Sequence, residues 1–320
     1  MTNEPHQPDL SRRSFLQTAA LGALAPSLVT RTRAAEIPSE VVLDHLIDAH
    51  VHVWTPDVER YPLVEGFARE KMVPRSFTPK ELLVHCRPQK VDRIVLIQMI
   101  FYGFDNRYML DAIAESPETF RGVAVIDDSK PGACDEMRRL ARLGVRGFRL
   151  YADKRSAESW LESPSMQAMW ACAADTGQAM CLLADPDSLP AVRQMCERYP
   201  DTKVVIDHFA RIGMRGPADS EDVDNLLRLA DFKHTFVKTS AFYALGKKQA
   251  PYLDLAPLIR RLRDVFGVER LMWASDCPYQ VQEGHTYADS IALIRDRLDF
   301  LTASDKAWML RGTAERVFFT

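Results

Sequence analysis

Two histidines separated by a single residue, His50 and His52, close an apolar run that begins at Leu46. Alternate residues of a β-strand point to the same side, so the two imidazoles share one face if this run is a strand. Two imidazoles on one face suit a divalent metal ion, although two polar residues on a strand would give the same pattern. The choice depends on whether further ligands arrive from other parts of the chain.

Two later segments supply such partners. The apolar run 203–207 leads into His208, and the run 270–274 leads into Asp276. Imidazole nitrogens and a carboxylate are suitable ligands for zinc, manganese or iron. We therefore expect one divalent ion, with zinc as the first choice. Its ligands would be the side chains of His50, His52, His208 and Asp276.

Elements that could bring these residues together are visible in the hydrophobic pattern. Apolar, β-branched runs alternate with amphipathic stretches along the chain. The expected strands are residues 46–53, 93–99, 121–126, 145–150, 179–184, 203–207, 235–239 and 270–274. The clearest helical patterns are residues 106–116, 134–143, 166–175, 189–199, 223–231 and 255–266.

Strands that are apolar on both faces and alternate with helices indicate a parallel sheet covered by helices. Eight such units predict an α/β fold of the (β/α)8 TIM-barrel type in a single domain, whose active site lies at the carboxyl ends of the strands. His50, His52, His208 and Asp276 all follow expected strands, so the barrel would gather them. Residues 55–78 carry several prolines and are expected to form a long first loop.

The first 34 residues do not fit the barrel pattern. A paired arginine, Arg12-Arg13, precedes a short apolar run, and a small-residue site follows near Ala34. This order is typical of a twin-arginine export signal, and the apolar run is too short to span a bilayer. We expect a signal over residues 1–34, a catalytic domain over residues 35–320, and a periplasmic location.

Composition narrows the partners. The formal net charge is −3 with both signs well mixed, which argues against nucleic acid or a membrane surface and leaves a small-molecule substrate. The oligomeric state stays open. Six cysteines lie scattered without a Cys-x-x-Cys pair, so their spacing assigns no disulfide, and most are expected to be small buried core residues.

Five segments together resemble the amidohydrolase superfamily, in its amidohydrolase-related branch of TIM-barrel hydrolases. They are "IDAHVHVW" (47–54), "GVRGFRL" (144–150), "VVIDHFAR" (204–211), "RLMWASDCPY" (270–279) and "RGTAERVF" (311–318). Within that branch the sequence is most similar to the 2-pyrone-4,6-dicarboxylate and sugar lactonases. The resemblance covers nearly all of the chain after residue 34.

The resemblance implies a role for each site residue. Asp276 matches the aspartate that acts as general base on the water that attacks a lactone carbonyl. His50, His52 and His208 match histidines that hold a divalent metal or, in the pyrone lactonases, help to polarise the carbonyl without metal. The implied activity is the hydrolysis of a small, carboxylated lactone.

Other matches concern substrate binding. Arg149, Arg155 and Arg211 resemble the arginines with which pyrone lactonases bind carboxylates, a task that suits the bidentate guanidinium. Tyr102 and Tyr151, near the ends of the second and fourth strands, are further candidates for the pocket wall. Three cations near the histidines would weaken a metal site, because unit charges ~6 Å apart repel by ~3 kcal/mol at an effective dielectric of 20. A site without metal is therefore the alternative.

The sequence also departs from these relatives. Ile100 stands where the pyrone lactonases carry a serine and Met72 where they carry a tyrosine, which makes the pocket more apolar. Strand 4 ends in Arg149 instead of a lysine or glutamate ligand, and strand 5 ends in Ala184 instead of histidine, which argues against a binuclear metal centre. Two other function classes remain: a metal-dependent decarboxylase of an aromatic or unsaturated acid, and a non-catalytic exported binding protein.

Overall fold

The computed structural model describes residues 43–320. The export signal predicted for residues 1–34 lies outside the described residues and stays a prediction. Among the described residues, no helix combines the length and apolar character needed to cross a membrane.

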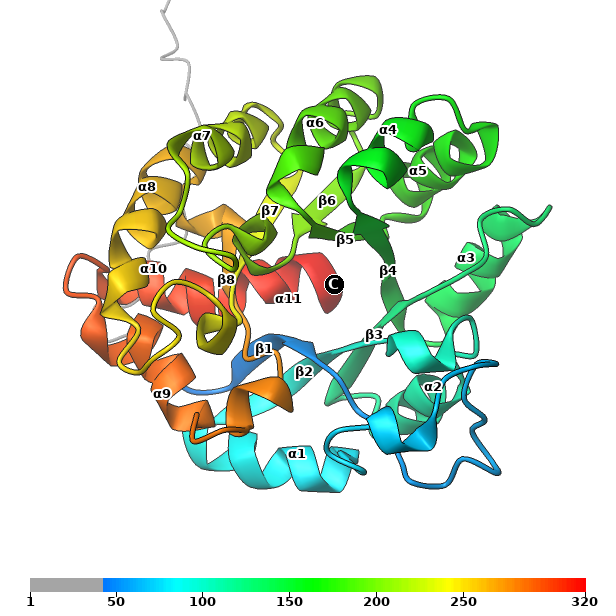
Figure 1. Ribbon diagram of the computed structural model, residues 1–320, viewed down its shortest axis with the longest axis horizontal. Coiled ribbons are helices and arrows are strands. Elements are labelled where there is room, and N and C mark those ends of the chain that lie inside the picture. Colours follow the sequence, from blue (N-terminus) through cyan, green and yellow to red (C-terminus); the bar gives the residue numbers. More distant parts are fainter. Residues whose placement is uncertain (1–42) are drawn as a thin grey trace, which may run out of the picture. The chain divides into compact units, whose positions relative to one another are not determined.

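Eight parallel strands pair in sequence order and form a nearly closed barrel (Figure 1), the arrangement of a TIM barrel. The predicted α/β fold with eight parallel strands is therefore confirmed. The strands are β1 (Leu46–Val51), β2 (Val91–Ile97), β3 (Phe120–Ala124), β4 (Val145–Ala152), β5 (Ala179–Ala184), β6 (Lys203–Ile206), β7 (Thr235–Thr239) and β8 (Leu271–Trp273).

Helices surround the strands on the outside (Figure 1). They are α1 (Pro79–Cys86), α2 (Arg107–Glu115), α3 (Ala133–Arg142), α4 (Lys154–Trp160), α5 (Pro164–Thr176), α6 (Leu189–Arg198), α7 (Ser220–Arg228), α8 (Ala256–Phe266), α9 (Tyr287–Ala292), α10 (Ala303–Ala307) and α11 (Thr313–Phe318). Helix α4 follows β4 directly and was absent from the predicted elements.

Local signals explain where the first helix starts. The Thr78 hydroxyl accepts a hydrogen bond from the Glu81 amide, and the Glu81 carboxylate accepts one from the Thr78 amide, which forms a capping box. Pro79 occupies the first helical position, where its missing N–H costs nothing. The long stretch before Thr78 forms no α-helix, as expected for the first loop; it is held by an antiparallel bridge between Trp54 and Phe77.

The first and last strands meet at a seam that depends on side chains as well as on backbone. A single parallel bridge joins Val51 to Cys277. Next to it, the buried Asp48 carboxylate accepts hydrogen bonds from the amides of His50 (3.1 Å) and Ser275 (2.9 Å) and from the Tyr287 hydroxyl (2.9 Å). Asp48 thus takes the place of part of the missing strand ladder.

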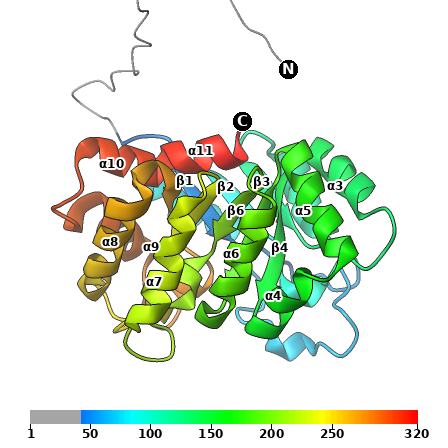
Figure 2. The ribbon, with the colours of Figure 1, turned by 90° about the horizontal axis from the view of Figure 1, so that it is seen from above.

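The core has two parts. One fills the barrel interior with small and medium residues of alternating strand positions, such as Ile47, Val95 and Val205. The other lies between the strands and the surrounding helices. Helix α11 covers one end of the barrel (Figure 2). Its Phe318 belongs to the interior cluster. That end is closed, so a site has to open at the other end, where the strands terminate.

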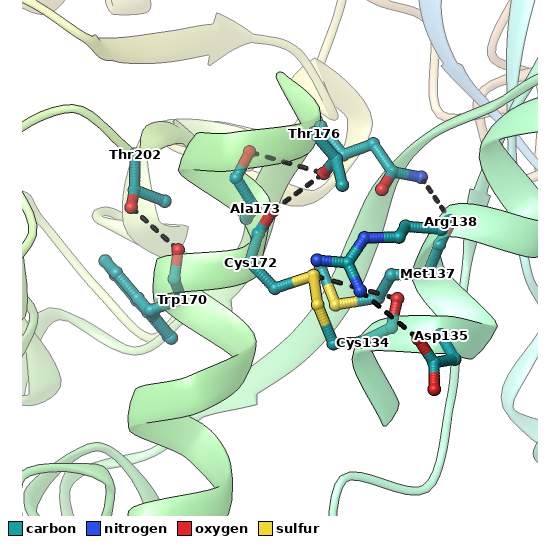
Figure 3. The surroundings of a disulfide bond; sticks show 10 residues. Cys134, Asp135, Met137, Arg138, Trp170, Cys172, Ala173, Thr176 and Thr202 are labelled. Atoms are coloured by element: carbon teal, nitrogen blue, oxygen red, sulfur yellow. Dashed lines mark hydrogen bonds and ion pairs between the residues drawn. A yellow bond between two sulfur atoms is a disulfide. The ribbon is translucent and has the colours of Figure 1, made fainter. Parts of the chain in front are cut away.

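A disulfide links two of the outer helices (Figure 3). Cys134 at the start of α3 is bonded to Cys172 on α5, with a Cα–Cα distance of 5.8 Å. The other four cysteines are buried and free, which confirms the interpretation of most cysteines as core residues.

Candidate active site

A β-bulge in β1 aims the two histidines. Along β1 the step from Asp48 to Val51 spans three residues, whereas the paired step on β2 spans two. This extra residue interrupts the regular alternation. Ala49, which belongs to the interior cluster, is therefore followed directly by His50, whose ring also reaches the interior side. The Nε2 atoms of His50 and His52 lie 3.2 Å apart, so the pair shares one site as predicted.

The chain after β6 turns in an unusual conformation. His208, Phe209, Ala210 and Arg211 all have positive φ angles, between 51° and 58°. Such left-handed backbone costs roughly 1–2 kcal/mol per residue for side chains other than glycine. It directs His208 toward the site, and Asp276 after β8 is held with a φ of 64°. Strained backbone of this kind gathers at functional sites.

The four predicted site residues converge. The Asp276 Oδ1 atom lies 3.5 Å from His50 Nε2 and 3.4 Å from His52 Nε2, and its Oδ2 atom lies 3.8 Å from His208 Nε2. The Tyr243 hydroxyl donates a 2.7 Å hydrogen bond to the same Oδ2. Tyr243 was not predicted; its position shortly after the end of β7 is the only sequence signal that could have indicated it.

Three fully or nearly buried charged residues, Arg149, Asp207 and Lys238, lie next to His50. Asp207 Oδ1 is 2.9 Å from Lys238 Nζ, and Asp207 Oδ2 is 3.1 Å from Arg149 Nη1. Neither carboxylate oxygen of Asp207 makes a hydrogen bond of regular geometry. Asp207 is therefore attracted to Lys238 and Arg149 mainly by their opposite charges, and burial strengthens this attraction. Lys238 sits on the interior side of β7, a placement that strand alternation alone could have suggested.

These neighbours set the protonation of the rings. The His52 Nδ1–H donates to the Ile97 carbonyl (2.9 Å), so its Nε2 keeps a lone pair. The Ser240 hydroxyl donates to a backbone carbonyl and accepts from His208 Nδ1 (2.8 Å), which leaves the His208 Nε2 lone pair facing the site. A neutral imidazole accepts at one nitrogen only, so Lys238 and Arg149 cannot both donate to His50. The Asp207 carboxylate 3.4 Å from Nδ1 favours a proton there and a lone pair on Nε2.

The same surroundings shift the pKa values. Burial lowers the pKa of His50 and of His208, so both rings are neutral at pH 7. Burial by itself would raise the pKa of Asp276, but His208 and the hydrogen-bonding His52 outweigh it and the pKa is lowered. Asp276 is therefore an ionised acceptor, and Tyr243, whose pKa is raised by burial and then by Asp276, stays a neutral donor.

The donor set fits one metal ion. His50 Nε2, His52 Nε2 and Asp276 Oδ1 are mutually 3.2 to 3.5 Å apart. Ligands at ~2.05 Å from a tetrahedral ion are about 3.3 Å from one another, so the spacing suits an ion the size of zinc. A second group, formed by His50, Asp207 and His208, reuses His50, and Asp207 is already engaged by Lys238 and Arg149. A binuclear centre therefore does not fit.

A cavity of about 310 Å³ opens above these groups. Its lining includes His52, His208, Asp276 and three of the predicted substrate-binding residues, Arg149, Arg211 and Tyr151.

Two predicted pocket residues lie elsewhere. Arg155 is exposed on α4, because the chain turns into that helix immediately after Asp153 caps it, and it does not line the cavity. Tyr102 is buried beside the cavity, where its hydroxyl accepts a hydrogen bond from the Thr55 amide. Of the two positions at which the sequence departs from the pyrone lactonases, Ile100 lines the cavity, whereas Met72 is buried and does not line it.

Comparison with known proteins identifies the family of the chain. The amidohydrolase family matches residues 47–320, which is most of the chain and includes all four converging residues. The chain belongs to the amidohydrolase family.

Two curated relatives of this family member are lactone hydrolases by name. The 2-pyrone-4,6-dicarboxylate hydrolase of Comamonas testosteroni is 29% identical over 255 residues, covering 77% of this chain and 80% of its own. The L-fucono-1,5-lactonase of Burkholderia ambifaria is 26% identical over 243 residues, covering 75% and 82%. A crystal structure of an amidohydrolase from Burkholderia multivorans with bound zinc has a TM-score of 0.74 at 20% identity, covering 86% of this chain and 99% of its own, which shows the shared fold.

Proposed function

We propose that this hydrolase opens a small, carboxylated lactone, with Asp276 as the general base. The proposal rests on the ionised Asp276 carboxylate, which lies at the floor of a cavity that is also lined by the Arg149 guanidinium. Its two oxygens face His50, His52 and His208, and Tyr243 holds one of them in place.

The reaction can be followed by its atoms. Asp276 accepts a proton from a water molecule as the water oxygen bonds to the lactone carbonyl carbon. The tetrahedral intermediate collapses, the ring C–O bond breaks, and the alkoxide leaving group takes up the proton from Asp276. The product is an open-chain hydroxy acid, and Asp276 is again ionised.

Arg149 is the best placed carboxylate-binding group. Its Nη1 is engaged by Asp207, whereas its buried Nε finds no hydrogen-bond partner within residues 43–320. Arg149 lines the cavity, so its guanidinium can meet a substrate carboxylate there. Arg211 lines the same cavity but is already paired with Asp185 at 2.7 Å, so it has a supporting role.

The direct test is a panel of aldonolactones and carboxylated lactones assayed by proton release. Asp276→Asn should reduce turnover by roughly 10²–10⁴-fold, as expected for the loss of a general base, with circular dichroism unchanged. Turnover of amides but of no lactone would point to an amidase, and metal-dependent release of carbon dioxide from an aromatic acid would point to a decarboxylase.

We further propose that the site holds one divalent ion, with zinc as the first choice, bound by His50, His52 and Asp276 with His208 close by. When bound, such an ion polarises a carbonyl and lowers the pKa of the attacking water. The fit of the three donor atoms supports this proposal. Elemental analysis of protein purified without chelator should find about one equivalent; less than a tenth, with activity unaffected by chelator, would contradict it.

Export to the periplasm is also a proposal. It rests on the Arg12-Arg13 pair and the apolar run behind it, and the disulfide between Cys134 and Cys172 supports an oxidising compartment. Fractionation of cells that produce the full chain, compared with an Arg12→Lys, Arg13→Lys variant, tests it. A wild-type protein found in the cytoplasm would contradict it.

A further inference from the structure

The walls of the cavity differ in character from its floor. The floor carries His52, His208 and Asp276, all buried. Beside the polar side chains of Gln98, Tyr151, Tyr243 and Tyr279 and the two arginines, the walls carry aliphatic and thioether side chains. These are Met99, Ile100, Leu183, Met214, Ala244 and Leu245.

Two of these side chains reach the surface at the mouth. Ile100 follows β2 and is 58% exposed, and Met214 follows the turn after β6 and is 39% exposed. Strands β2 and β6 are four apart in an eight-stranded barrel, so these side chains approach the cavity from opposite sides. An apolar group that covers exposed aliphatic side chains removes their surface from water, which favours binding. Two such side chains on opposite sides of a pocket are therefore suited to an apolar part of a ligand.

Both arginines that line the cavity already have a carboxylate partner. Arg149 is paired with Asp207, and Arg211 with Asp185. Lys238, below the floor, is also paired with Asp207. Within residues 43–320, the cavity lining therefore offers no arginine or lysine without a carboxylate partner to a second substrate carboxylate.

We propose that the lactone carries one carboxylate and an apolar alkyl or aryl substituent, which packs between Ile100 and Met214. The inference rests on the proposed lactone hydrolysis and specifies its substrate class. Hydroxyl groups of a polyhydroxylated lactone that lie against Leu183, Met214 and Leu245 would find no hydrogen-bond partner in these side chains, which is unfavourable. A lactone with two carboxylates would have to bind two guanidinium groups, Arg149 and Arg211, that are each already paired with an aspartate.

The experiment compares matched six-membered lactones with the same ring carboxylate. One has no further substituent, one has an n-butyl group and one has two hydroxyls. We expect kcat/KM for the butyl lactone to exceed that of the unsubstituted one at least tenfold, since one methylene in an apolar pocket is worth about tenfold or more. The dihydroxy lactone should be the poorest of the three.

Variants then locate the effect. Met214→Gln and Ile100→Asn, which keep approximate size, should each reduce the butyl-to-unsubstituted ratio of kcat/KM by about tenfold. The matched control is Val265→Asn, which removes an apolar side chain on α8 whose exposure lies between those of Ile100 and Met214, and it should change neither the ratio nor the activity. Equal or better turnover of the dihydroxy lactone, or an unchanged ratio in both cavity variants, would overturn the inference.

A second readout separates this inference from the proposed reaction. Calorimetry measures binding of the ring-opened hydroxy acids with butyl or hydroxyl substituents. If no lactone is opened but the butyl acid binds more tightly and Met214→Gln removes the difference, the apolar subsite is supported and lactone hydrolysis is contradicted. If no lactone is opened and the two acids bind equally, both proposals are overturned.

Discussion

Asp207, Lys238 and Arg149, the buried charged residues next to His50, fix the position of its ring. Asp207 is fully buried, yet its pKa is lowered: burial would raise it, but Lys238, His50 and Arg149 outweigh that effect. A charge in such a place persists only while its partners remain. Asp207 and its two cations therefore form a rigid base that fixes the His50 ring.

Removal of one of these partners should cost stability. For Lys238→Met we expect a loss of about 3–5 kcal/mol in the free energy of unfolding in urea, because Asp207 loses its closest cation while staying buried. The double variant with Asp207→Asn should recover much of this loss. Lys233→Met, which breaks an exposed pair with Asp201 at 4.0 Å, is the control and should cost less than 1 kcal/mol. Equal effects of the two lysine substitutions would show that the buried pair has no special role.

Tyr243 should matter for turnover more than for stability. Tyr243→Phe removes the hydrogen bond to Asp276 Oδ2, and a bond to a charged group is worth about 1.5–3 kcal/mol, so kcat/KM should fall at least tenfold. Tyr102→Phe removes a hydroxyl that contacts backbone outside the cavity and serves as the comparison. Kinetics on the best lactone of the panel measure both, and a drop confined to Tyr102→Phe would refute the assigned position of Tyr243.

At the scale of elements, the seam between β1 and β8 is the feature on which the site depends. Asp276 donates its amide to the His50 carbonyl (2.9 Å), and His52 donates its amide to the Cys277 carbonyl (2.8 Å). These two bonds place Asp276 and the two histidines side by side. Asp48, two residues before His50 on β1, joins the same two segments because its carboxylate accepts hydrogen bonds from the amides of His50 and Ser275.

Substitution of Asp48 tests the seam. In Asp48→Ala the amides of His50 and Ser275 and the Tyr287 hydroxyl lose their acceptor, and each buried unpaired donor costs about 1–3 kcal/mol, so we expect a loss of at least about 3 kcal/mol in unfolding free energy. Asp48→Asn keeps one acceptor oxygen and should lose less. Urea denaturation measures both; an alanine variant as stable as wild type would mean that backbone pairing alone closes the barrel.

The sequence predicts the strands and the four converging residues because both depend on local pattern: apolar runs end where His50, His208 and Asp276 stand. It does not predict the bulge in β1, because an extra residue leaves no mark on composition. The left-handed turn at His208–Arg211 contains no glycine, so the usual signal of positive φ is missing. Arg155 was assigned to the pocket from its resemblance to an arginine of the pyrone lactonases, and the short helix α4 carries it to the surface instead.

For the whole molecule, the disulfide is the main covalent constraint besides the chain. It joins cysteines 38 residues apart and ties α3 to α5, with β4 and Arg149 on the segment between them. By restricting the unfolded chain, a bond across such a loop contributes about 3–4 kcal/mol. The helices it links lie outside the barrel, so it should affect stability more than the geometry of the site.

Reduction should therefore lower the unfolding free energy by about 3–4 kcal/mol, while the double variant Cys134→Ala, Cys172→Ala should be insensitive to reductant. A thiol count provides the check. Denatured, unreduced protein should show four reactive thiols and reduced protein six, because the remaining cysteines are free. Six thiols without reductant would mean that the bond does not form.

The seam has one more consequence, which concerns the time at which the protein becomes active. His50 and His52 are made early in synthesis, but Asp276 and the strand that pairs with them are among the last parts of the barrel to leave the ribosome. Helix α11, which closes the opposite end, follows later still. No amino-terminal fragment, however long, can contain a complete site until β8 has been added. If Asp276 is the base as proposed, we expect an incomplete chain to be catalytically silent, so that activity reports directly on the closed barrel.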